Sequence, residues 1–508
     1  MMRLDNATQA AAWLHQHVGA GTLQTDSRRI QPGDAFIAWP GAATDGRQYV
    51  AASLNAGASC CLVESAGVQS YGFADARIAQ VTGLKAMSGL IAAAYYEQPS
   101  NSLDVIAVTG TNGKTSSAWW IAQSLNIVRA DALRKKEHSA QYSCGLIGTL
   151  GMGTPGKMVS TGLTTPDPVM LQAELARLRD AGASACAMEA SSIGIAEQRM
   201  AGVQVKIAVF TNFTQDHLDY HGSMDAYWLA KRALFGMPGL LAAVINLDDS
   251  KGDELAAYCK ARGLNVMSTS QIRTDATLCG SKPEHQASGM RFDVMHSGQK
   301  QSVSCPVVGD FNAANMLGVI GALLALGVGL TAACQAVSGS TAVPGRMELI
   351  ADVEQPLMVV DYAHTPDALA KALAALRATA QARGGKLWCV FGCGGSRDPS
   401  KRPLMAQAVQ AGADHIVVTS DNPRHESAQI IIDQVMLGFD RDASKIQQKH
   451  DRRQAIRWAA HHAHSDDVIL IAGKGHEDTQ EIAGIKHPFS DTEEARSALA
   501  ARARGDAA

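Results

Sequence analysis

The sequence is poor in aromatic residues and has no excess of positive charge. Of its 508 residues, 5% are aromatic, and 45 Lys and Arg are balanced by 48 Asp and Glu, which gives a net charge of −3. Without a basic excess, the chain lacks the overall field that attracts a phosphate polymer or an anionic membrane surface. We therefore expect no nucleic acid and no membrane surface as its main partner.

The ten cysteines also lack a pattern. None forms a C-x-x-C pair and their spacing is irregular, so neither a disulfide framework nor a cysteine metal site is predicted. Residues 1–17 are polar and charged, without the apolar segment of a signal peptide. We expect reduced, buried cysteines and a cytoplasmic location.

Long apolar runs are scarce, and only residues 316–334 could mimic a membrane span. This stretch is uncharged and about long enough to cross a bilayer. Its four glycines, the Gly-Val-Gly-Leu-Thr break at 327–331 and the lack of basic or aromatic flanks favour two buried helices instead. No membrane insertion is expected.

The length of the chain and its apolar content predict several domains. With 46% hydrophobic residues it can bury several cores, and its length predicts three domains. Strand-like runs alternate with helical segments, which is typical of α/β folds with parallel sheets. We expect an N-terminal α/β domain at 1–102, a central P-loop-type domain with a mostly parallel sheet at 103–338, and a Rossmann-like α/β domain at 339–508, built from four strand-loop-helix units.

A candidate phosphate loop follows the predicted strand Val105–Val108. Backbone N–H groups of a glycine-containing loop at a helix N-terminus bind anions, a lysine adds charge, and a threonine hydroxyl can bind magnesium. Val108 stands where the usual motif has its first glycine, so a chance match is the alternative, but strand before and helix after is the required context. The loop residues are Gly110, Thr111, Asn112, Gly113, Lys114, Thr115 and Ser116.

Two further predicted strands end in metal-binding residue types. Glu189 follows the strand at 185–188, and His217 follows the strand at 206–210. Ligands of open α/β sheets bind at the carboxyl ends of the strands, so both residues are candidate ligands of a divalent cation. Taken alone, the cluster of His217, Asp219 and His221 would suit zinc about as well as magnesium, and such a cluster is more often an ordinary surface loop than either metal site. Its pairing with a phosphate loop favours magnesium.

Many short motifs occur in one order along essentially the whole chain, and together they resemble the Mur ligase family. This resemblance implies an ATP-dependent amide ligase of peptidoglycan precursor synthesis, with ATP and magnesium as cofactors. The motifs are Asp26–Arg28, Asp45–Arg47, the phosphate loop, Leu163–Pro166, Met188–Ser192, Thr211–Gly222, Tyr227 with Lys231, Gly309–Asn315, Pro344–Arg346, Asp361–His364, Gly392–Asp398, Asp421–Arg424 and Gly473–Glu477.

The resemblance implies roles in the first two domains. Lys231, which by itself reads as a solvated lysine of a helix at 225–235, matches the family's carbamylated lysine. The implied catalytic residues are Lys114, His217 and Lys231, and the implied magnesium ligands are Thr115, Glu189, His217 and carbamylated Lys231. The UDP-linked substrate is matched to Ser27, Thr164, Thr165, Ser191 and Arg199.

The resemblance also implies roles for later residues. Asn312 and Asn315 match adenine contacts, and Arg346 and Asp361 lie where the C-terminal domain closes over the nucleotide. Arg424 matches a signature of family members that add diaminopimelate, whose distal carboxylate suits a bidentate guanidinium. The implied diaminopimelate contacts are Arg397, Asp421, Asn422, Pro423, Arg424, Gly473 and Glu477.

The resemblance therefore implies two small-molecule partners, UDP-N-acetylmuramoyl-L-alanyl-D-glutamate and meso-diaminopimelate. We expect the chain to be a monomer. A relative that adds lysine, or that adds glutamate to folate, would share the ATP-binding half but would not match the Asp421–Arg424 motif and the UDP-binding N-terminal domain. A P-loop switch or motor should show a guanine-reading N-K-x-D motif or a basic stripe that binds nucleic acid, and the sequence has neither. A catalytically dead scaffold is disfavoured because the catalytic positions are all present.

Four positions depart from the family pattern. They are Ile193, Gln215, Glu197 and Thr479. Glu197 places a negative charge near the anionic substrate that the resemblance implies, which opposes a contact between the two. The polar segment 129–143 is expected to be an exposed excursion with no counterpart in the family.

Overall fold

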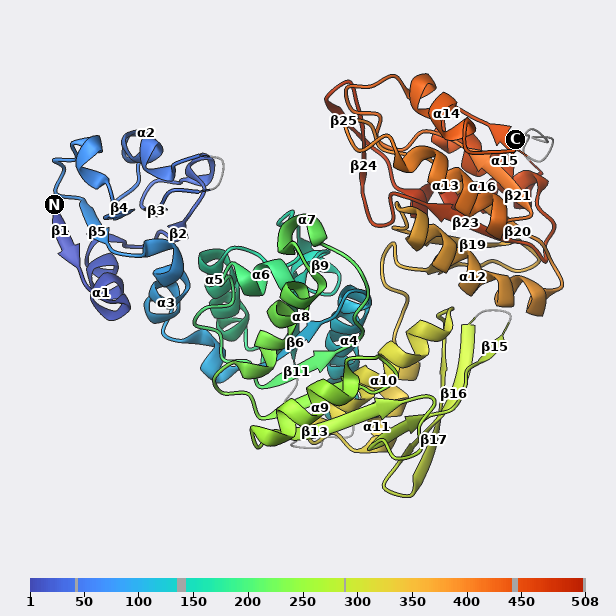
Figure 1. The fold of residues 1–508 in the computed structure, drawn as a ribbon, viewed down its shortest axis with the longest axis horizontal. Coiled ribbons are helices and arrows are strands. Elements are labelled where there is room, and N and C mark those ends of the chain that lie inside the picture. The colour runs from blue at the N-terminus through green and yellow to red at the C-terminus, as the bar shows by residue number, and fades with distance from the viewer. Residues whose placement is uncertain (42–43, 135–142, 287–288, 441–445, 506–508) are drawn as a thin grey trace. The chain divides into compact units, whose positions relative to one another are not determined.

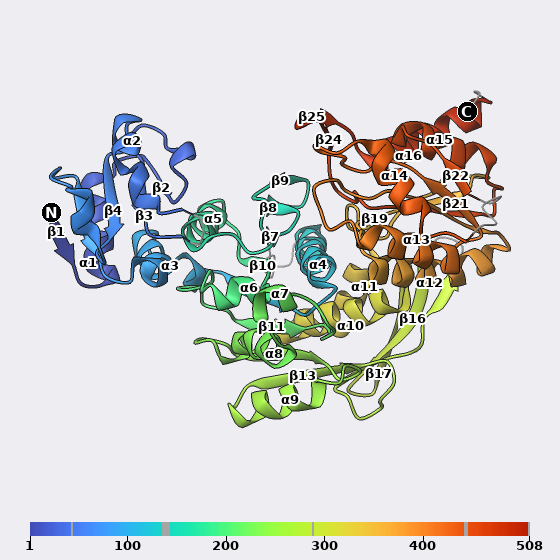
Figure 2. The same cartoon turned by 45° about the horizontal axis from the view of Figure 1, so that its top comes forward.

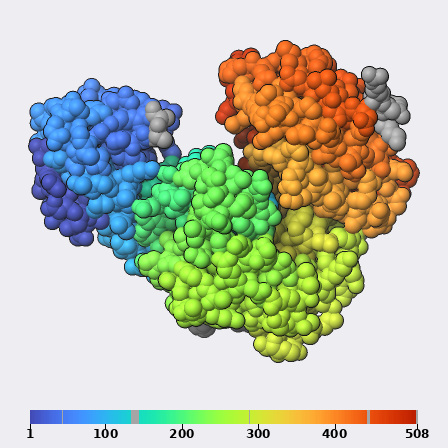
Figure 3. Space-filling model, in the orientation of Figure 1, coloured from blue at the N-terminus to red at the C-terminus, as the bar shows by residue number. Residues whose placement is uncertain are grey.

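A computed structural model describes residues 1–41, 44–134, 143–286, 289–440 and 446–505 (Figure 1). The chain separates into two compact units. The first comprises residues 1–278 and 317–336, and the second comprises residues 279–316 and 337–508. In the space-filling view, residues that are close in the sequence gather in patches of similar colour (Figure 3).

The N-terminal residues of the first unit form a five-stranded parallel sheet in the order β1-β5-β4-β3-β2. Alternate side chains of each strand enter opposite cores, since successive residues point to opposite faces. Leu62 packs with α1 and α3 on one face, and Val63 packs with α2 on the other. The elements are β1 (Met2–Leu4), α1 (Ala7–His17), β2 (Leu23–Gln24), β3 (Ala35–Ala38), α2 (Val50–Asn55), β4 (Cys60–Glu64), β5 (Ile78–Val81) and α3 (Leu84–Tyr95).

The next sheet of the first unit runs β13-β12-β11-β6-β10-β7-β8-β9 and is parallel from β13 to β7. In its register Glu189 lies opposite Val108, and Phe210 lies opposite Thr109. The carboxyl ends of three central strands therefore meet, as predicted. The strands are β6 (Asp104–Thr109), β7 (Cys144–Gly148), β8 (Gly151–Thr154), β9 (Lys157–Val159), β10 (Ala185–Glu189), β11 (Ile207–Phe210), β12 (Ala242–Asn246) and β13 (Asn265–Ser270).

Helices cover this sheet. Residues of α5, α8 and α9 share one core with β6, β10, β11 and β12, whereas α4 packs against β6, β7 and β10. The short helices α6 and α7 follow the carboxyl ends of β10 and β11. The helices are α4 (Lys114–Arg134), α5 (Pro168–Asp180), α6 (Ser192–Ala196), α7 (Leu218–His221), α8 (Met224–Arg232) and α9 (Gly252–Ala261), with 3₁₀ turns at Ser27–Arg29, Gly46–Tyr49, Val68–Tyr71, Pro99–Ser102 and Ala233–Gly236.

In the second unit, a six-stranded sheet runs β18-β19-β23-β20-β21-β22 (Figure 2). Cys389 of β20 enters a core with α12, α13 and α14, and the next residue, Val390, enters a core with α15 and α16. The elements are β18 (Glu348–Ile350), β19 (Leu357–Asp361), α12 (Pro366–Arg383), β20 (Leu387–Phe391), α13 (Lys401–Gly412), β21 (His415–Val418), α14 (Ala428–Met436), β22 (Ile446–Gln448), α15 (Arg452–His462), β23 (Val468–Ala472) and α16 (Asp491–Arg504).

The apolar run at 316–334 forms two helices, as predicted. The first, α10 (Asp310–Ala325), and the second, α11 (Leu330–Ser338), are separated at Gly327, whose φ of 87° ends the helical path. Within the described ranges, no helix is long and apolar enough to cross a membrane. Ahead of α10 lie β14 (Leu278–Gly280), β15 (Glu284–Gln286), β16 (Gly289–His296) and β17 (Gln299–Cys305), with β16 antiparallel to β15 and β17.

The helix predicted for the fourth unit of the C-terminal region is wrong. After β23 the chain forms an antiparallel hairpin of β24 (Thr479–Ile482) and β25 (Ile485–Pro488). Buried Gln480 donates from Nε2 to the Ser420 hydroxyl at 2.9 Å and to the Asp421 carbonyl at 2.6 Å. These hydrogen bonds to residues distant in the sequence stabilise the hairpin over the helix that the local pattern predicts. In the expected excursion at 129–143, residues 129–134 continue α4, and residues 135–142 lie outside the described residues.

Candidate active site

The phosphate loop adopts the geometry that its sequence predicts. It connects β6 to α4, and α4 begins at Lys114, so N–H groups of the first turn lack partners inside the helix. Gly110 has a φ of 155°, and a Cβ there would lie 1.9 Å from Thr211 Oγ1, so only glycine fits. Asn212, which follows β11, is hydrogen-bonded to the loop: its Oδ1 accepts from the N–H of Asn112 at 2.9 Å. A glycine-containing loop at a helix N-terminus is an arrangement that can bind an anion.

Two lysines converge on one carbonyl oxygen of this loop. Lys114 Nζ donates to the Gly110 carbonyl at 2.9 Å, and Lys231 Nζ from α8 donates to the same oxygen at 2.7 Å. Lys231 is 1% exposed, so the solvated interpretation of this residue is wrong. Burial, followed by repulsion from Lys114, lowers the pKa of Lys231 to about 6. At neutral pH its amine is therefore mostly uncharged.

Glu189 lies at the centre of a network of oxygen atoms. Its carboxylate accepts from the Thr115 hydroxyl at 2.9 Å, from the Thr149 N–H at 2.7 Å and from the Thr149 hydroxyl at 3.2 Å. Thr149 Oγ1 lies in turn 3.0 Å from Thr164 Oγ1. A carboxylate and hydroxyls are hard oxygen donors, the type that magnesium prefers. The residues at this position therefore fit a magnesium ion.

His217 does not join this network. It is half-exposed, has a left-handed backbone with φ of 50°, and its Nε2 lies 3.5 Å from Asp216 Oδ2. Neighbouring His221 instead contacts the Ser192 hydroxyl at 3.0 Å. Within the described part of the chain, no three His, Cys, Asp or Glu side chains are grouped so that they could hold a metal ion. The zinc alternative therefore gains no support.

The residues matched to the muramoyl-peptide lie beside Glu189. Thr165 Oγ1 donates to the Glu189 carbonyl at 2.8 Å and lies 3.1 Å from Ser191 Oγ. Arg199 donates to the Thr165 carbonyl at 3.0 Å. Ser27 begins a 3₁₀ turn that follows β2 of the N-terminal sheet. The first unit thus brings Thr164, Thr165, Ser191 and Arg199 into one hydrogen-bonded neighbourhood.

The unusual Glu197 has partners of its own. Its carboxylate accepts from Lys85 of α3 at 2.6 Å and from the Tyr220 hydroxyl at 2.5 Å, and these hydrogen bonds lower its pKa. The negative charge that departs from the family pattern is thus neutralised by a lysine 112 positions earlier in the chain.

Four residues matched to the nucleotide lie in the second unit. Asn312 and Asn315 are buried near the start of α10, and Asn315 Nδ2 donates to Asn312 Oδ1 at 3.3 Å. Arg346 lies over the Tyr362 ring, with its guanidinium carbon 4.6 Å from the ring centroid. Asp361 accepts from the Met347 N–H at 2.8 Å and the Ala363 N–H at 2.9 Å, and burial raises its pKa.

The segment Asp421–Arg424 follows β21, and the β24–β25 hairpin fixes its end. Arg424 has a left-handed backbone with φ of 53°; its N–H donates to the Glu481 carbonyl at 3.0 Å, and its own carbonyl accepts from the Ala483 N–H at 2.6 Å. Arg424 Nη1 donates to the Gly395 carbonyl at 2.9 Å. Its side chain is about a quarter exposed, whereas Arg397 is exposed. The hairpin therefore sets the direction of a partly accessible guanidinium.

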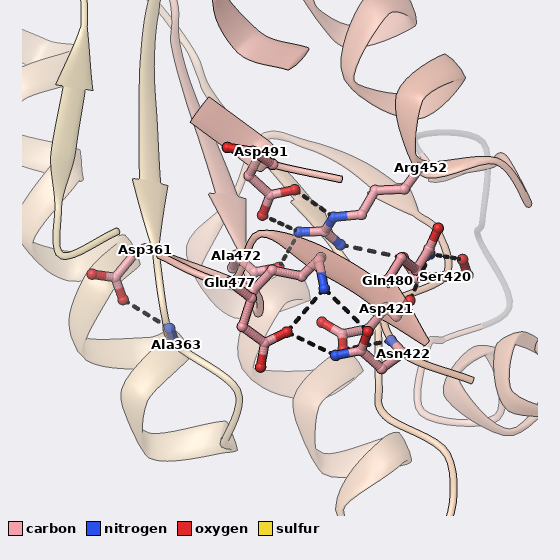
Figure 4. A network of polar contacts seen from close by, with 12 residues as sticks. Asp361, Ala363, Ser420, Asp421, Asn422, Arg452, Ala472, Glu477, Gln480 and Asp491 are labelled. Atoms are coloured by element: carbon pink, nitrogen blue, oxygen red, sulfur yellow. Dashed lines mark hydrogen bonds and ion pairs between the residues drawn. The ribbon is translucent and has the colours of Figure 1, made fainter. Parts of the chain in front are cut away.

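Asn422 connects this segment to Glu477, as Figure 4 shows. Asn422 Nδ2 donates to Glu477 Oε2 at 2.7 Å. Gly473, with φ of 121°, lies so close to Asp421 that a Cβ would be 2.5 Å from Asp421 Oδ2. Burial raises the pKa of Asp421. The fold thus groups Asp421, Asn422, Gly473 and Glu477, as the sequence motifs predict, with Pro423 packed so that its carbonyl excludes any side chain at Gly395.

Sequence reasoning missed three buried charges next to this group. Lys474 contacts Asn422 and Glu477, and the Arg452–Asp491 ion pair is completely buried, with two contacts of 2.7 Å (Figure 4). Arg452 also donates to the Ser420 carbonyl at 3.3 Å and to the Ala472 carbonyl at 2.9 Å. It therefore joins the ends of β21 and β23. The position of Lys474 inside the Gly473–Glu477 motif was a signal that could have drawn attention to it. The sequence around Arg452 contains no motif that indicates its burial.

Replacing Asp491 with alanine should lower the free energy of unfolding by about 3–5 kcal/mol, because Arg452 would remain buried without its counter-charge. Urea unfolding followed by circular dichroism measures the loss. The matched control is Glu493→Ala on the same helix, since Glu493 is exposed and its replacement should cost less than about 1 kcal/mol. Equal losses in the two variants would contradict a structural role for the buried pair.

Family models match the chain in three consecutive segments. They are described as "Mur ligase family, catalytic domain" at residues 21–96, "Mur ligase middle domain" at 108–323 and "Mur ligase, glutamate ligase domain" at 345–475. The chain belongs to the Mur ligase family. It is therefore a ligase, and the fold class predicted from its sequence is confirmed.

Relatives of this Mur ligase match it over nearly its whole length. A UDP-N-acetylmuramoyl-L-alanyl-D-glutamate–2,6-diaminopimelate ligase of Acidovorax sp. (strain JS42) is 52% identical over 499 residues, which cover 98% of each chain. A ligase with the same name from Janthinobacterium sp. (strain Marseille) is 46% identical and covers 96% of each. A solved structure with this name is 35% identical and covers 95% of each chain, with a TM-score of 0.67.

Proposed function

We propose that this Mur ligase is a cytoplasmic enzyme that uses ATP to add meso-2,6-diaminopimelate to UDP-N-acetylmuramoyl-L-alanyl-D-glutamate, in the synthesis of peptidoglycan precursors. Two relatives, 52% and 46% identical over 98% and 96% of this chain, carry the name of this activity. The observation that carries the choice of amino acid is the Asp421–Arg424 segment, which Asn422 ties to Glu477.

The proposal assigns one substrate to each of three regions. Residues 1–102, with Ser27, hold the uridine diphosphate; residues 103–338, with the phosphate loop, hold ATP; and residues 339–508, with Arg424, hold the amino acid. Adenine contacts are assigned to Asn312 and Asn315, and closure over the nucleotide to Arg346 and Asp361. The chain is expected to act as a monomer.

Glu189 and Thr115 would hold magnesium, together with Lys231 after its amine has reacted with carbon dioxide. His217, which lies outside the Glu189 network, is assigned as a further ligand by the family resemblance alone. Carbamylation requires a neutral amine, and the burial of Lys231 supports that requirement. Bound magnesium would neutralise charge on the transferring phosphoryl group. The arrangement of hard oxygen donors around Glu189 supports this assignment.

The reaction proceeds in two steps. The γ-carboxylate of D-glutamate attacks the γ-phosphorus of ATP, the bond to the β-phosphate oxygen breaks, and ADP leaves. The free amine of diaminopimelate then attacks the acyl carbon, an amide bond forms, and phosphate leaves as the nitrogen loses its proton. Phosphoryl transfer depends on positioning and charge neutralisation, which the amides of the phosphate loop and Lys114 would provide.

Phosphate release should depend on meso-diaminopimelate far more strongly than on L-lysine, because lysine lacks the distal carboxylate that Arg424 would bind. The loss of one bidentate charge contact predicts a difference in kcat/KM of roughly 30- to 1,000-fold. The assay contains ATP, magnesium and the UDP-linked dipeptide, with each amino acid in turn. Equal turnover with L-lysine would overturn the assignment of diaminopimelate as the substrate, but it would not contradict an ATP-dependent ligase activity.

A further inference from the structure

Lys474 is a completely buried lysine with no role in the nucleotide or metal site. It follows β23, and its side chain has no exposed surface. Its Nζ donates to Glu477 Oε2 at 2.9 Å, to Asn422 Oδ1 at 3.1 Å and to the Thr479 carbonyl at 2.6 Å. An ammonium group has three donors. All three are occupied by protein acceptors, so Lys474 has none left for a substrate.

Glu477, by contrast, is held at one oxygen and open at the other. Oε2 accepts from both Lys474 and Asn422, whereas Oε1 makes no hydrogen bond to any residue that the structure describes. The side chain is about one third exposed. Burial alone would raise the pKa of Glu477, but the nearby Lys474 charge and the two hydrogen bonds lower it below the ordinary value. A fixed carboxylate therefore presents one free, ionised oxygen to a ligand.

Asn422 is held by the same lysine. Its Oδ1 accepts from Lys474 and from the Glu481 N–H at 2.9 Å, which leaves its Nδ2 turned toward Glu477. Lys474 thus holds the Asn422 amide oxygen together with the Glu481 N–H, and holds the Glu477 carboxylate together with Asn422. Without the ammonium, Asn422 would lose one donor to its Oδ1, and Glu477 would keep a single anchor, the Asn422 amide.

We propose that Lys474 is a positioning residue that aims Glu477 at the distal ammonium of the amino-acid substrate and so creates the requirement for a second amine. This inference rests on the proposed function, because it assumes that Glu477 belongs to the diaminopimelate site. Lys474 acts through Glu477 and does not touch the substrate. Its removal should therefore weaken recognition of the distal amine specifically, and leave recognition of the distal carboxylate by Arg424 in place.

The decisive comparison uses 2-aminopimelate, which keeps the distal carboxylate of diaminopimelate and lacks its distal amine. In Lys474→Met, kcat/KM for diaminopimelate should fall roughly 10- to 100-fold, the usual range for the loss of a hydrogen bond to a charged group. The kcat/KM for 2-aminopimelate and the KM for ATP should stay close to those of the unaltered chain. The preference for diaminopimelate over 2-aminopimelate would then shrink. A merely structural role would lower both values together, and that result would overturn the proposal.

Two further variants separate the possible failures. If Glu477→Gln leaves diaminopimelate use unchanged, Glu477 is not in the site and the proposed site itself is wrong. If Glu477→Gln removes the preference but folded Lys474→Met does not, only the role of Lys474 is wrong. The control is Lys486→Met, since Lys486 is exposed on β25 and should behave like the unaltered chain.

Folding must be checked because Lys474 is buried. Thermal unfolding and the KM for ATP report whether Lys474→Met is intact. If it does not fold, the double variant Lys474→Met with Glu477→Gln removes both charges and relieves the unpaired carboxylate. The proposal predicts that this variant matches Glu477→Gln in its preference between the two amino acids, because both changes act on one contact. A further loss of preference beyond Glu477→Gln would contradict it.

Discussion

Ligation should fall by roughly 10²–10³-fold when Lys231 is replaced with methionine, the usual cost of removing one group that stabilises charge at a reacting centre. Lys231 is 1% exposed and donates to the Gly110 carbonyl at 2.7 Å, so it is fixed against the phosphate loop. Methionine has a similar length but can neither donate that bond nor form a carbamate. Phosphate release at saturating ATP and amino acid measures the rate.

Two controls make this result specific. Lys260→Met, at an exposed lysine of α9, should leave the rate unchanged. In Lys231→Ala, where the shorter side chain leaves space, a small carboxylate such as propionate should restore part of the activity, because it can replace the carbamate oxygens; Lys231→Met should not respond. Full activity in Lys231→Met would remove this lysine from the reaction. If activity is lost strongly and propionate does not restore it in Lys231→Ala, Lys231 only stabilises the phosphate loop and does not form a carbamate that takes part in the reaction.

The second large effect is expected at Arg424. Replacing it with alanine should lower kcat/KM for diaminopimelate roughly 30- to 1,000-fold, since a charge contact to the distal carboxylate is lost. The KM for ATP should not change, because the phosphate loop lies in a different part of the chain. Initial rates at varied diaminopimelate and fixed ATP measure the effect. Arg424→Lys should recover little, because an ammonium cannot reproduce the two parallel hydrogen bonds of a guanidinium.

L-lysine tests whether this effect is local. Because lysine has no distal carboxylate, its residual use should be nearly the same in Arg424→Ala as in the unaltered chain. Arg457→Ala, at an exposed position on α15, serves as the control for the loss of a surface arginine. If Arg424→Ala lowered the use of both amino acids equally, Arg424 would be a structural residue of the hairpin junction. The Arg424 and Lys474 variants therefore test opposite ends of the same zwitterionic group.

The sequence alone predicted the features that depend on local pattern. The phosphate loop could be placed because strand, glycine-containing turn and helix follow one another directly, and α4 begins at Lys114. The apolar run at 316–334 could be divided because glycines interrupt it, and α10 and α11 are the result. Glu189 could be expected near Thr115 because the carboxyl ends of parallel strands meet at one edge, and the two side chains are in contact at 2.9 Å.

Local pattern was less informative where a residue's environment comes from elsewhere in the chain. The segment after β23 reads as a helix, yet it pairs as a hairpin because Gln480 and Glu481 bond to residues about 60 positions earlier. Similarly, Glu197 looks like an unfavourable charge until Lys85 is placed beside it.

By itself, then, the sequence determined the α/β class, the phosphate loop, the order of the family motifs and the identity of the residues that carry charge. Only the tertiary structure decided which of those charges are buried and which side chains they meet. Lys231 and Lys474 resemble any helix or loop lysine in the sequence, but one shares a carbonyl with Lys114 and the other is enclosed by three acceptors. The physical reason is that burial and pairing depend on contacts between residues distant in the chain, whereas motifs and periodicity report only on neighbours.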